Sequence, residues 1–501
     1  MNRAGPLFSE LSLPVALVQT LRRLNPWWEG LPSAPQPATR RHLVRQLRSR
    51  LDRRIAPIIV LRGPRQIGKT VAQLQLLGDL LLEGMEPNRI LRVQFDELSA
   101  LERLEDPILR VVEWFERTVL GSTLNEAARS GRPAYLFFDE VQNLRGWAPQ
   151  LKSLVDSSSV QVVVTGSSAL RIEIGRDSLA GRISTIEAGV LSLTEIGRFR
   201  GVDVGEPLLP DNGLEPLTRR DFWLEVREAG STRAAERDQA FAWFSERGGY
   251  PVVHKRPDLD WSFLATQLNE DVIRRVIQHD LRTGDRGRKR DAPLLEELFR
   301  MSCRYVGQAP GASLLAREAQ RALGANVGST RVLNYLRFLG DSLLLRLVEP
   351  LEIRLKRRRG SPKLCLADHG LRASWLQEQV PLDPSELARQ PELTVLAGRI
   401  AESVVGATLS TIPSLGLTHV PARPAEPEID FVLTIGTRRI PLEVKYQRRI
   451  DPLADTEGLR TFIERSVNNA PFGVLVTQAD ETPVLDPRII ALPLSSLMLL
   501  R

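Results

Sequence analysis

Residues 63–70 read GPRQIGKT and match the pattern G-x-x-x-x-G-K-[ST] in full. They follow IAPIIVL, a short β-branched run, and precede VAQLQLLGDLLLEG, which has the periodicity of a helix. In such a strand–loop–helix, backbone N–H groups face phosphate charge, and glycines let the backbone approach it closely. This context disfavours a chance match on an ordinary turn and predicts ATP binding. The predicted nucleotide-binding residues of the loop are Gly63, Pro64, Arg65, Gln66, Ile67, Gly68, Lys69 and Thr70.

Side chains for ATP hydrolysis are predicted in two segments. In the loop, Lys69 would pair with the β- and γ-phosphates and Thr70 would ligate Mg²⁺. In YLFFDE, an apolar strand ends in Asp139, a predicted metal ligand, and Glu140, which would position or activate the attacking water. Acidic residues at strand ends are common, but after a phosphate-binding loop in an alternating β/α chain this pair indicates an ATPase.

Two further nucleotide contacts are predicted with alternatives left open. The strand QVVVTGSSAL places Thr165 and Ser167 at its carboxyl end, where α/β sheets bind ligands. Thr165 is a candidate sensor of the γ-phosphate, although an ordinary strand-end turn predicts the same residue equally well. Arg182, in LAGRI, is a candidate arginine finger that acts in its own chain or in a neighbouring copy. A surface cation is the alternative for Arg182.

A second group of chemically useful residues lies near the C-terminus. Asp430 is in EIDFVL, while Glu443 and Lys445 are in IPLEVKYQ and share one face of a strand because they are two residues apart. A tight turn at GTRR would bring Asp430 beside them. Two carboxylates are ligands for Mg²⁺ or Mn²⁺, and a lysine can orient or deprotonate a water for attack on a phosphodiester. A solvated hairpin face with an ordinary Glu–Lys pair is the alternative.

The elements that must position these residues follow an α/β pattern. Short apolar runs alternate with helical segments up to about residue 200, which predicts a mostly parallel sheet covered on both faces. The C-terminal part shows a helix, a hairpin, a second helix and a buried strand. The predicted segments are an N-terminal helical extension (1–54), a P-loop ATPase core (55–200), a linker and helical lid (201–285), a winged helix (286–375) and a C-terminal α/β domain (376–501).

The winged helix is predicted from three short helices followed by two strands. The basic runs RKR (288–290) and KRRR (356–359) bracket it, and Arg331 and Arg337 lie on its third helix. Such cations suit contacts to DNA phosphates, which position a protein without reading sequence. A packing module with a solvated loop is the alternative.

Composition excludes several classes of protein. The chain has 68 Lys and Arg against 61 Asp and Glu, 42% hydrophobic residues and two cysteines. These values exclude a disordered chain, a collagen-like fibre and a disulfide-stapled miniprotein. No membrane span and no signal peptide are predicted, so we expect a cytoplasmic protein without a membrane partner. The net charge of +7 makes a polyanionic partner plausible.

Several segments in order resemble one group of proteins: GPRQIGKT, LFFDEVQNLRGWAPQLKSLVD, VVVTGSS, LAGRISTIEAGVLSLTEI and GGYP. They are similar to prokaryotic AAA-type (STAND-like) P-loop ATPases that carry a C-terminal domain of unknown function. The resemblance covers roughly residues 40–500 and implies a restriction-endonuclease-like core in that domain. The D…E-x-K arrangement resembles the catalytic core of such nucleases, and Glu402 in RIAESVVG matches their additional acidic residue.

Two functions from different classes follow from these observations. The first is an ATP-binding and ATP-hydrolysing protein whose nucleotide state controls a DNA-binding or metal-dependent nuclease module. The second is a non-nuclease molecular switch or scaffold, in which ATP binding orders a homo-oligomer or recruits a partner. A small-molecule kinase is disfavoured because no acceptor site is evident. Nucleic acid, with DNA favoured, is the predicted macromolecular partner.

Overall fold

The computed structural model describes residues 13–96, 101, 104–166, 179–209, 213–279, 291–352, 360–422 and 427–501. The chain divides into two compact units, Met1–Ala188 and Gly189–Arg501. This division is coarser than the five segments predicted from the sequence. The predicted N-terminal extension belongs to the same unit as the predicted ATPase core. Three features singled out above, Ser167 and the basic runs at 288–290 and 356–359, lie outside the described residues.

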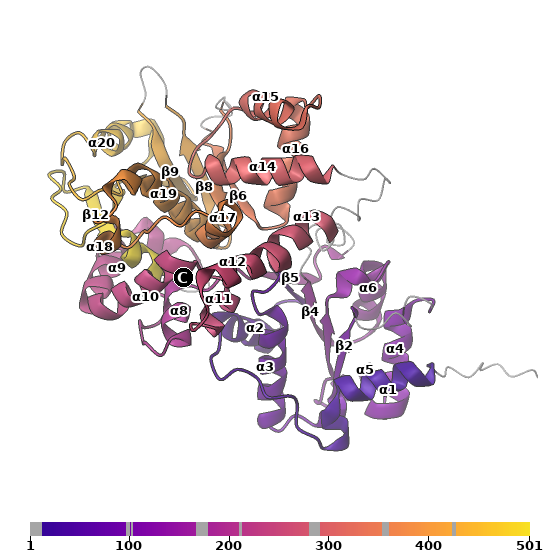
Figure 1. Cartoon of the computed structure of the whole chain (residues 1–501). Helices are drawn as coiled ribbons and strands as arrows, with labels where there is room; N and C mark the ends of the chain where they lie inside the picture. The colour runs from indigo at the N-terminus through magenta and orange to yellow at the C-terminus, as the bar shows by residue number, and fades with distance from the viewer. Residues whose placement is uncertain are drawn as a thin grey trace, which may run out of the picture. The chain divides into compact units, whose positions relative to one another are not determined.

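A five-stranded sheet in the order β2-β3-β4-β1-β5 forms the centre of the first unit, and its paired strands are all parallel. The sheet confirms the predicted parallel α/β core. Helices α2 and α3 lie on one side of it, and α4 and α6 on the other (Figure 1). The strands are β1 (Ile58–Arg62), β2 (Ile90–Gln94), β3 (Tyr135–Asp139), β4 (Gln161–Gly166) and β5 (Ile183–Glu187). The helices are α1 (Val15–Leu24), η1 (Pro26–Glu29), α2 (His42–Asp52), α3 (Lys69–Leu82), α4 (Pro107–Phe115), α5 (Leu124–Arg129) and α6 (Trp147–Ser157).

The predicted N-terminal extension is part of the first unit because it covers the free edge of β2. Asn25 accepts a hydrogen bond from the Arg92 N–H (2.6 Å) and donates one to the Arg92 carbonyl (2.8 Å). The indole N–H groups of Trp27 and Trp28 both donate to the Ile90 carbonyl, at 3.2 and 2.8 Å. An uncovered edge strand exposes unpaired backbone groups, so these contacts close the sheet on that side.

A seven-stranded mixed sheet in the order β12-β11-β10-β9-β8-β6-β7 forms the centre of the second unit. The strands are β6 (Leu345–Pro350), β7 (Lys363–Leu366), β8 (Gly416–Val420), β9 (Ile429–Ile435), β10 (Arg438–Val444), β11 (Gly473–Thr477) and β12 (Ile489–Pro493). The helices are α8 (Leu193–Phe199), α9 (Arg220–Thr232), α10 (Ala234–Arg247), α11 (Pro251–Lys255), α12 (Trp261–Leu268), α13 (Arg275–His279), α14 (Ala292–Arg304), α15 (Ala312–Leu323), α16 (Ser329–Asp341), α17 (His369–Leu376), α18 (Pro384–Leu387), α19 (Thr394–Ser410), α20 (Glu457–Glu464) and α21 (Leu494–Leu497).

The region predicted as a winged helix has the expected order of elements. Helices α14, α15 and α16 precede β6 and β7, which pair antiparallel. However, β6 also pairs with β8 in parallel, so the two strands continue into the large sheet instead of forming a separate module. The winged helix therefore stays a prediction.

Helix α19 is the most apolar long helix among the described residues. The stretch Pro391–Ser410 has the length and mean hydropathy (1.2) of a membrane span, although none was predicted, and half of it is buried inside the protein. The helix contacts β6, β7 and β10. It carries Glu402 within the stretch, and we therefore describe it as a core helix of the second unit.

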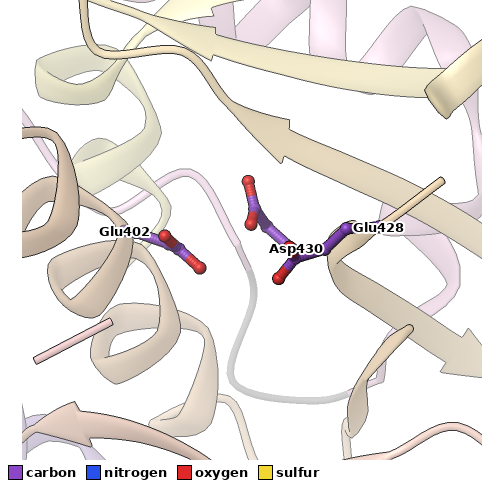
Figure 2. A group of neighbouring side chains, drawn as sticks. All are labelled: Glu402, Glu428 and Asp430. Atoms are coloured by element: carbon purple, nitrogen blue, oxygen red, sulfur yellow. The ribbon is translucent and has the colours of Figure 1, made fainter. Parts of the chain in front are cut away.

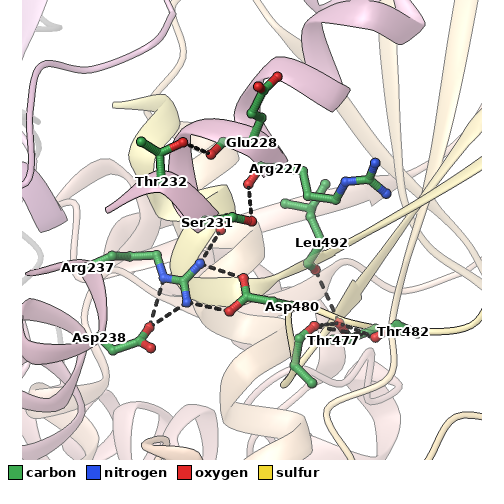
Figure 3. A network of polar contacts seen from close by, with 12 residues as sticks. Arg227, Glu228, Ser231, Thr232, Arg237, Asp238, Thr477, Asp480, Thr482 and Leu492 are labelled. Carbon is green, nitrogen blue, oxygen red and sulfur yellow. Dashed lines mark hydrogen bonds and ion pairs between the residues drawn. The ribbon is translucent and has the colours of Figure 1, made fainter. Parts of the chain in front are cut away.

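Hydrogen bonds of one arginine connect helix α10 to the segments that follow strands β11 and β12. The guanidinium of Arg237 on α10 donates to both carboxylate oxygens of Asp480, at 2.6 and 2.8 Å (Figure 3). It also donates to the Ser496 hydroxyl at 2.9 Å. Nearby, a Cβ on Gly230 of α9 would lie 1.9 Å from the Ser496 Oγ atom. These contacts show that the predicted linker and lid pack into the second unit.

Candidate functional site

The predicted phosphate-binding loop connects β1 to α3. A Cβ on Gly63 would lie 2.4 Å from the Ala188 carbonyl, and Gly68 has the left-handed φ of 85°, so both positions require glycine. The Lys69 ammonium is buried and donates to the carbonyls of Gly63 (3.1 Å) and Pro64 (2.7 Å). The backbone carbonyls of the loop thus bind the loop's own lysine. The loop lies at the carboxyl end of the parallel sheet, where α/β sheets bind ligands.

Asp139 is the centre of the acidic half of this site. Its Oδ1 atom accepts hydrogen bonds from the hydroxyl groups of Thr70, at 3.3 Å, and Thr165. Burial raises the pKa of the Asp139 carboxyl, and the hydrogen bond from Thr165 and the charge of Arg92 only partly offset this effect. The structure thus brings together three residues that the sequence predicted from separate motifs.

Glu140 follows Asp139 at a sharp turn of the chain. Its φ of 52° is left-handed, a conformation that costs energy for residues other than glycine and concentrates at functional sites. The Glu140 N–H donates to the Thr165 hydroxyl at 3.4 Å, and the Gln142 amide donates to the Glu140 carboxylate at 2.5 Å.

Arg92 is a residue of this site that the sequence analysis missed. Its guanidinium is buried and donates to the Asp139 Oδ2 atom at 3.2 Å and to the Gln94 side chain at 3.0 Å. Strand β2 lies beside β3 in parallel register, so Arg92 reaches Asp139 from the adjacent strand. A charged residue inside the apolar run ILRVQF was the available signal, because buried charges are almost always paired.

Arg41 is a second missed residue next to the loop. It is the residue before α2 and is buried, and its guanidinium donates to the Ile67 carbonyl at 2.7 Å. The segment that precedes β1 therefore supports the phosphate-binding loop. In the sequence Arg41 is one of several cations of the basic run RRHLVRQLRSRLDRR, and the others are exposed or half-buried, so its type alone did not distinguish it.

Arg182 does not lie at the nucleotide site of its own chain, so this part of the prediction is wrong. The Arg182 carbonyl accepts from the N–H of Ile58, the first residue of β1, whereas the loop follows the last residue of that strand. A five-residue strand separates the two ends by about 17 Å. The guanidinium is instead paired with both carboxylate oxygens of Asp156, at 2.5 and 2.9 Å. A role in a neighbouring copy stays a prediction.

The second candidate site lies where β9 and β10 pair antiparallel. Leu442 is opposite Phe431, which places Glu443 beside Asp430 as the hairpin predicted. The Asp430 carboxylate accepts from the Val444 N–H at 2.9 Å, and the Lys445 ammonium lies 3.1 Å from the Glu443 carboxylate. The structure therefore brings Asp430, Glu443 and Lys445 together.

Glu402 joins this site from helix α19, as the resemblance implied. Figure 2 shows its carboxyl group facing those of Asp430 and Glu428, and single oxygen atoms of the three groups lie within 4.8 Å of one another. Burial and the neighbouring Asp430 raise the pKa of Glu402 well above its usual range. Glu428 is an additional acidic residue that the sequence analysis did not single out.

Lys363 is the missed cation of the second site. Its ammonium on β7 is 1% exposed and bonds to Glu402, to the Asp430 Oδ1 atom at 2.9 Å and to the Glu428 carboxylate at 3.5 Å. Burial would raise the pKa of Asp430, but Lys363 and the hydrogen bonds from Glu402 and Val444 together lower it below its usual value. The signal in the sequence was a lysine at the start of the apolar strand KLCL.

Glu443 is only partly satisfied by these contacts. It is 8% exposed, and its Oε2 atom has no hydrogen-bond partner among the described residues. Burial raises the pKa of this carboxyl group to about 8, and the charge of Asp430 contributes to the shift. A buried carboxyl oxygen without a partner is costly, and a divalent cation is one group that would satisfy it.

Two family models match separate parts of the chain. The family model of an AAA domain matches residues 56–197, and that of a domain of unknown function (DUF8612) matches residues 239–381. An uncharacterized protein of Mycobacterium tuberculosis is 24% identical over 414 residues, which cover 81% of this chain and 74% of that protein. An uncharacterized protein of Methanocaldococcus jannaschii is 34% identical over 121 residues, 24% of this chain and 23% of that one.

Solved structures also show similarity. A Walker-type ATPase of Pyrococcus abyssi matches 68% of this chain and 99% of its own, with 16% identity and a TM-score of 0.36. AMPPCP-bound DnaA from Aquifex aeolicus matches 63% of this chain and 91% of its own, with 14% identity and a TM-score of 0.23.

The DUF8612 match ends before Glu402 and Asp430, so the family models leave the second site unassigned. The AAA match contains the phosphate-binding loop, Asp139 and Glu140. Together with the parallel sheet that positions these residues, it shows that the first unit is a P-loop ATPase domain of the AAA type.

Proposed function

We propose that this protein hydrolyses Mg·ATP in its first unit, and that its nucleotide state controls a metal-dependent phosphodiesterase site in its second unit. Nucleic acid, with DNA favoured, is the proposed substrate because the chain carries a net charge of +7 and phosphate is the group that both sites suit. The single observation that supports the phosphodiesterase site is the Oε2 atom of buried Glu443, which has no hydrogen-bond partner in the described part of the chain and lies beside Asp430 and Lys445.

In the ATPase unit, each side chain has a distinct task. Lys69 would exchange the carbonyls of its own loop for the phosphates of ATP. Mg²⁺, when bound, neutralises charge on the phosphate oxygens, and Thr70 and Asp139 fit it because their oxygens already lie 3.3 Å apart. Glu140, at the turn after Asp139, orients the attacking water.

In the second unit, four carboxyl groups share one site with two ammonium groups. The carboxyl groups belong to Glu402, Glu428, Asp430 and Glu443, and the ammonium groups to Lys363 and Lys445. This excess of acid fits a divalent cation held by Asp430 and Glu443. The cation supplies charge stabilisation for attack on a phosphodiester.

Lys445 suits orienting the water better than deprotonating it. Burial would lower its pKa, but the Glu443 carboxylate raises the pKa above the usual value. The ammonium therefore keeps its proton at neutral pH. A charged donor next to the metal ligands can hold a water and stabilise the developing negative charge.

Cleavage of DNA tests this function. Supercoiled plasmid and single-stranded DNA are incubated with full-length protein and Mg²⁺ or Mn²⁺, with and without ATP. We expect ATP-dependent nicking that falls about 10²-fold or more in Lys445→Ala. The matched control is Lys255→Ala, an exposed lysine of the same unit. Absence of nicking by the wild type, or nicking unchanged in Lys445→Ala, would exclude the nuclease.

A non-nuclease switch is the second candidate, and the position of Lys363 favours it. Its ammonium already neutralises part of the acidic group, as would be expected of a binding scaffold without a metal. In that case Lys69→Ala would abolish an ATP-dependent change in oligomeric state or partner binding. Light scattering with and without ATP measures the first of these effects, and no change in scattering would count against an oligomerising switch.

A further inference from the structure

Lys363 occupies the position that a cation would take among three carboxyl groups. Single oxygens of Glu402, Glu428 and Asp430 lie within 4.8 Å of one another, a spacing that suits a hard cation. The same three groups are the ion-pair partners of the Lys363 ammonium. The cluster is thus already occupied by a charge that belongs to the protein.

The surroundings of Lys363 hold its side chain in this position. The residue is 1% exposed, and its ammonium lies 5.2 Å from the centroid of the Phe431 ring, within cation–π range. Its strand is anchored because the Val348–Lys363 pair belongs to the β6–β7 ladder. A long flexible lysine therefore has little freedom to leave the acidic group.

Glu443 shows that the neighbouring acidic position is different. Its Oε2 atom has no partner among the described residues, although Glu443 is buried and lies next to Asp430. The Lys363 ammonium pairs with Asp430 through Oδ1, while Oδ2 accepts from the Val444 N–H. The Oδ1 side of Asp430 is therefore filled by an internal cation, whereas the neighbouring Glu443 carboxylate keeps one oxygen that no described residue bonds to.

We propose that the Lys363 ammonium replaces a divalent ion in the Glu402–Glu428–Asp430 cluster, so that the second unit uses one metal ion, at Asp430 and Glu443. The one-metal conclusion rests on the phosphodiesterase proposed above. The replacement itself does not, because it concerns only what fills the cluster. Lys363 is a specificity-determining residue that sets the number of ions bound.

Counting bound Mn²⁺ tests this inference. Chelator-treated, nucleotide-free, full-length protein is titrated with Mn²⁺ by calorimetry and by electron paramagnetic resonance. We expect Lys363→Ala to bind one more ion per chain than the wild type, and Mn²⁺ to raise its Tm by about 5 °C more. Equal numbers of ions in the two proteins would overturn the proposal, as would a Lys363→Ala protein that fails to fold even with Mn²⁺.

Glu428 provides a control that does not disturb the buried core, because its side chain is 49% exposed. Glu428→Gln should weaken Mn²⁺ binding by the wild type only slightly, through the loss of one neighbouring charge, since Lys363 fills the cluster. In the Lys363→Ala background the same substitution should weaken the additional ion at least about tenfold. Loss of wild-type binding in Glu428→Gln would show that the cluster itself holds the metal, and the proposal would be wrong.

The experiment separates this inference from the proposed nuclease. If the nuclease site is absent, the wild type binds no Mn²⁺ that depends on Glu443, yet Lys363→Ala still gains its ion. If the replacement by Lys363 is wrong, binding through Glu443 persists and no ion is gained.

Discussion

Two buried aspartates, one in each unit, are paired with a basic residue from another strand. Asp139 lies 3.2 Å from Arg92, and Asp430 lies 2.9 Å from Lys363. Both cations come from the edge strand of their sheet, β2 in the first unit and β7 in the second. Each unit therefore contains an ion pair between a cation of an edge strand and a buried aspartate.

The two pairs differ in what they leave for a ligand. Burial raises the pKa of Asp139 despite Arg92, whereas Lys363 and two hydrogen bonds lower the pKa of Asp430 against the effect of burial. The first site receives further cationic groups from its phosphate-binding loop. The second contains its cation already and has surplus acid at Glu443. The same kind of ion pair thus lies in a candidate nucleotide site in one unit and in an acidic candidate metal site in the other.

Removal of Arg92 tests the first pair most severely. Arg92→Met leaves Asp139 buried without its cation, which we expect to lower the free energy of unfolding of the first unit by about 3–5 kcal/mol. The double variant Arg92→Met/Asp139→Asn should recover most of this loss because neither charge remains. Urea unfolding measures both variants. A loss below about 1 kcal/mol in Arg92→Met would show that the pair does not resemble that of Lys363.

Lys69→Ala tests the claim that a phosphate-binding cation distinguishes the first site. We expect ATP turnover to fall about 10²–10³-fold because a charge aimed at the transferring phosphate is lost. The matched control is Lys152→Ala, an exposed lysine of α6 in the same unit, which should retain full activity. A steady-state phosphate-release assay gives both rates, and full activity in Lys69→Ala would contradict the assignment.

Glu443→Gln tests the surplus acid of the second site. The pKa of Glu443 is raised from 4.5 to about 8, so between these values the folded protein holds a proton that the unfolded chain has released. Stability of the metal-free protein should therefore fall as pH rises through this window, by up to about 1.4 kcal/mol per pH unit, and level off above it.

In Glu443→Gln this decline should be flatter. Thermal unfolding from pH 5 to pH 9 in the presence of a chelator measures it. If the Tm values of the variant and the wild type depend on pH in the same way, Glu443 is not the group that causes the decline in stability.

Asn25→Ala tests whether the edge strand must be fastened for Arg92 to act. The substitution removes the side chain that bonds to both backbone groups of Arg92 and to the Leu21 carbonyl. We expect a loss of about 1–3 kcal/mol, smaller than that of Arg92→Met, because buried backbone groups lose their partners. Combined with Arg92→Met, the effects should be non-additive in urea unfolding, and strict additivity would separate the edge contacts from the ion pair.

Much of the first site could be predicted because each of its parts is a short continuous motif in the sequence. The loop from Gly63 to Thr70 carries its own glycines and lysine, and Asp139 with Glu140 ends an apolar strand. Parallel strands place their carboxyl ends at one edge of a sheet, so local pattern and general topology were sufficient. The prediction that Arg182 contacts the nucleotide of its own chain was wrong because Arg182 precedes β5, at the end of the strand away from the phosphate-binding loop.

The pairing of Asp430 with Glu443 was also determined by the sequence alone, since one tight turn joins their strands. Only the tertiary structure decided that Lys363 lies against Asp430, because β8 and β6 come between β9 and β7 in the sheet and helix α19 brings Glu402 to the same place. Local spacing carries the chemistry of the phosphate-binding loop and of the β9–β10 hairpin. Arg92 and Lys363, which balance the charge of the buried aspartates, are brought to them by the order of strands in the two sheets. No short stretch of sequence encodes that order.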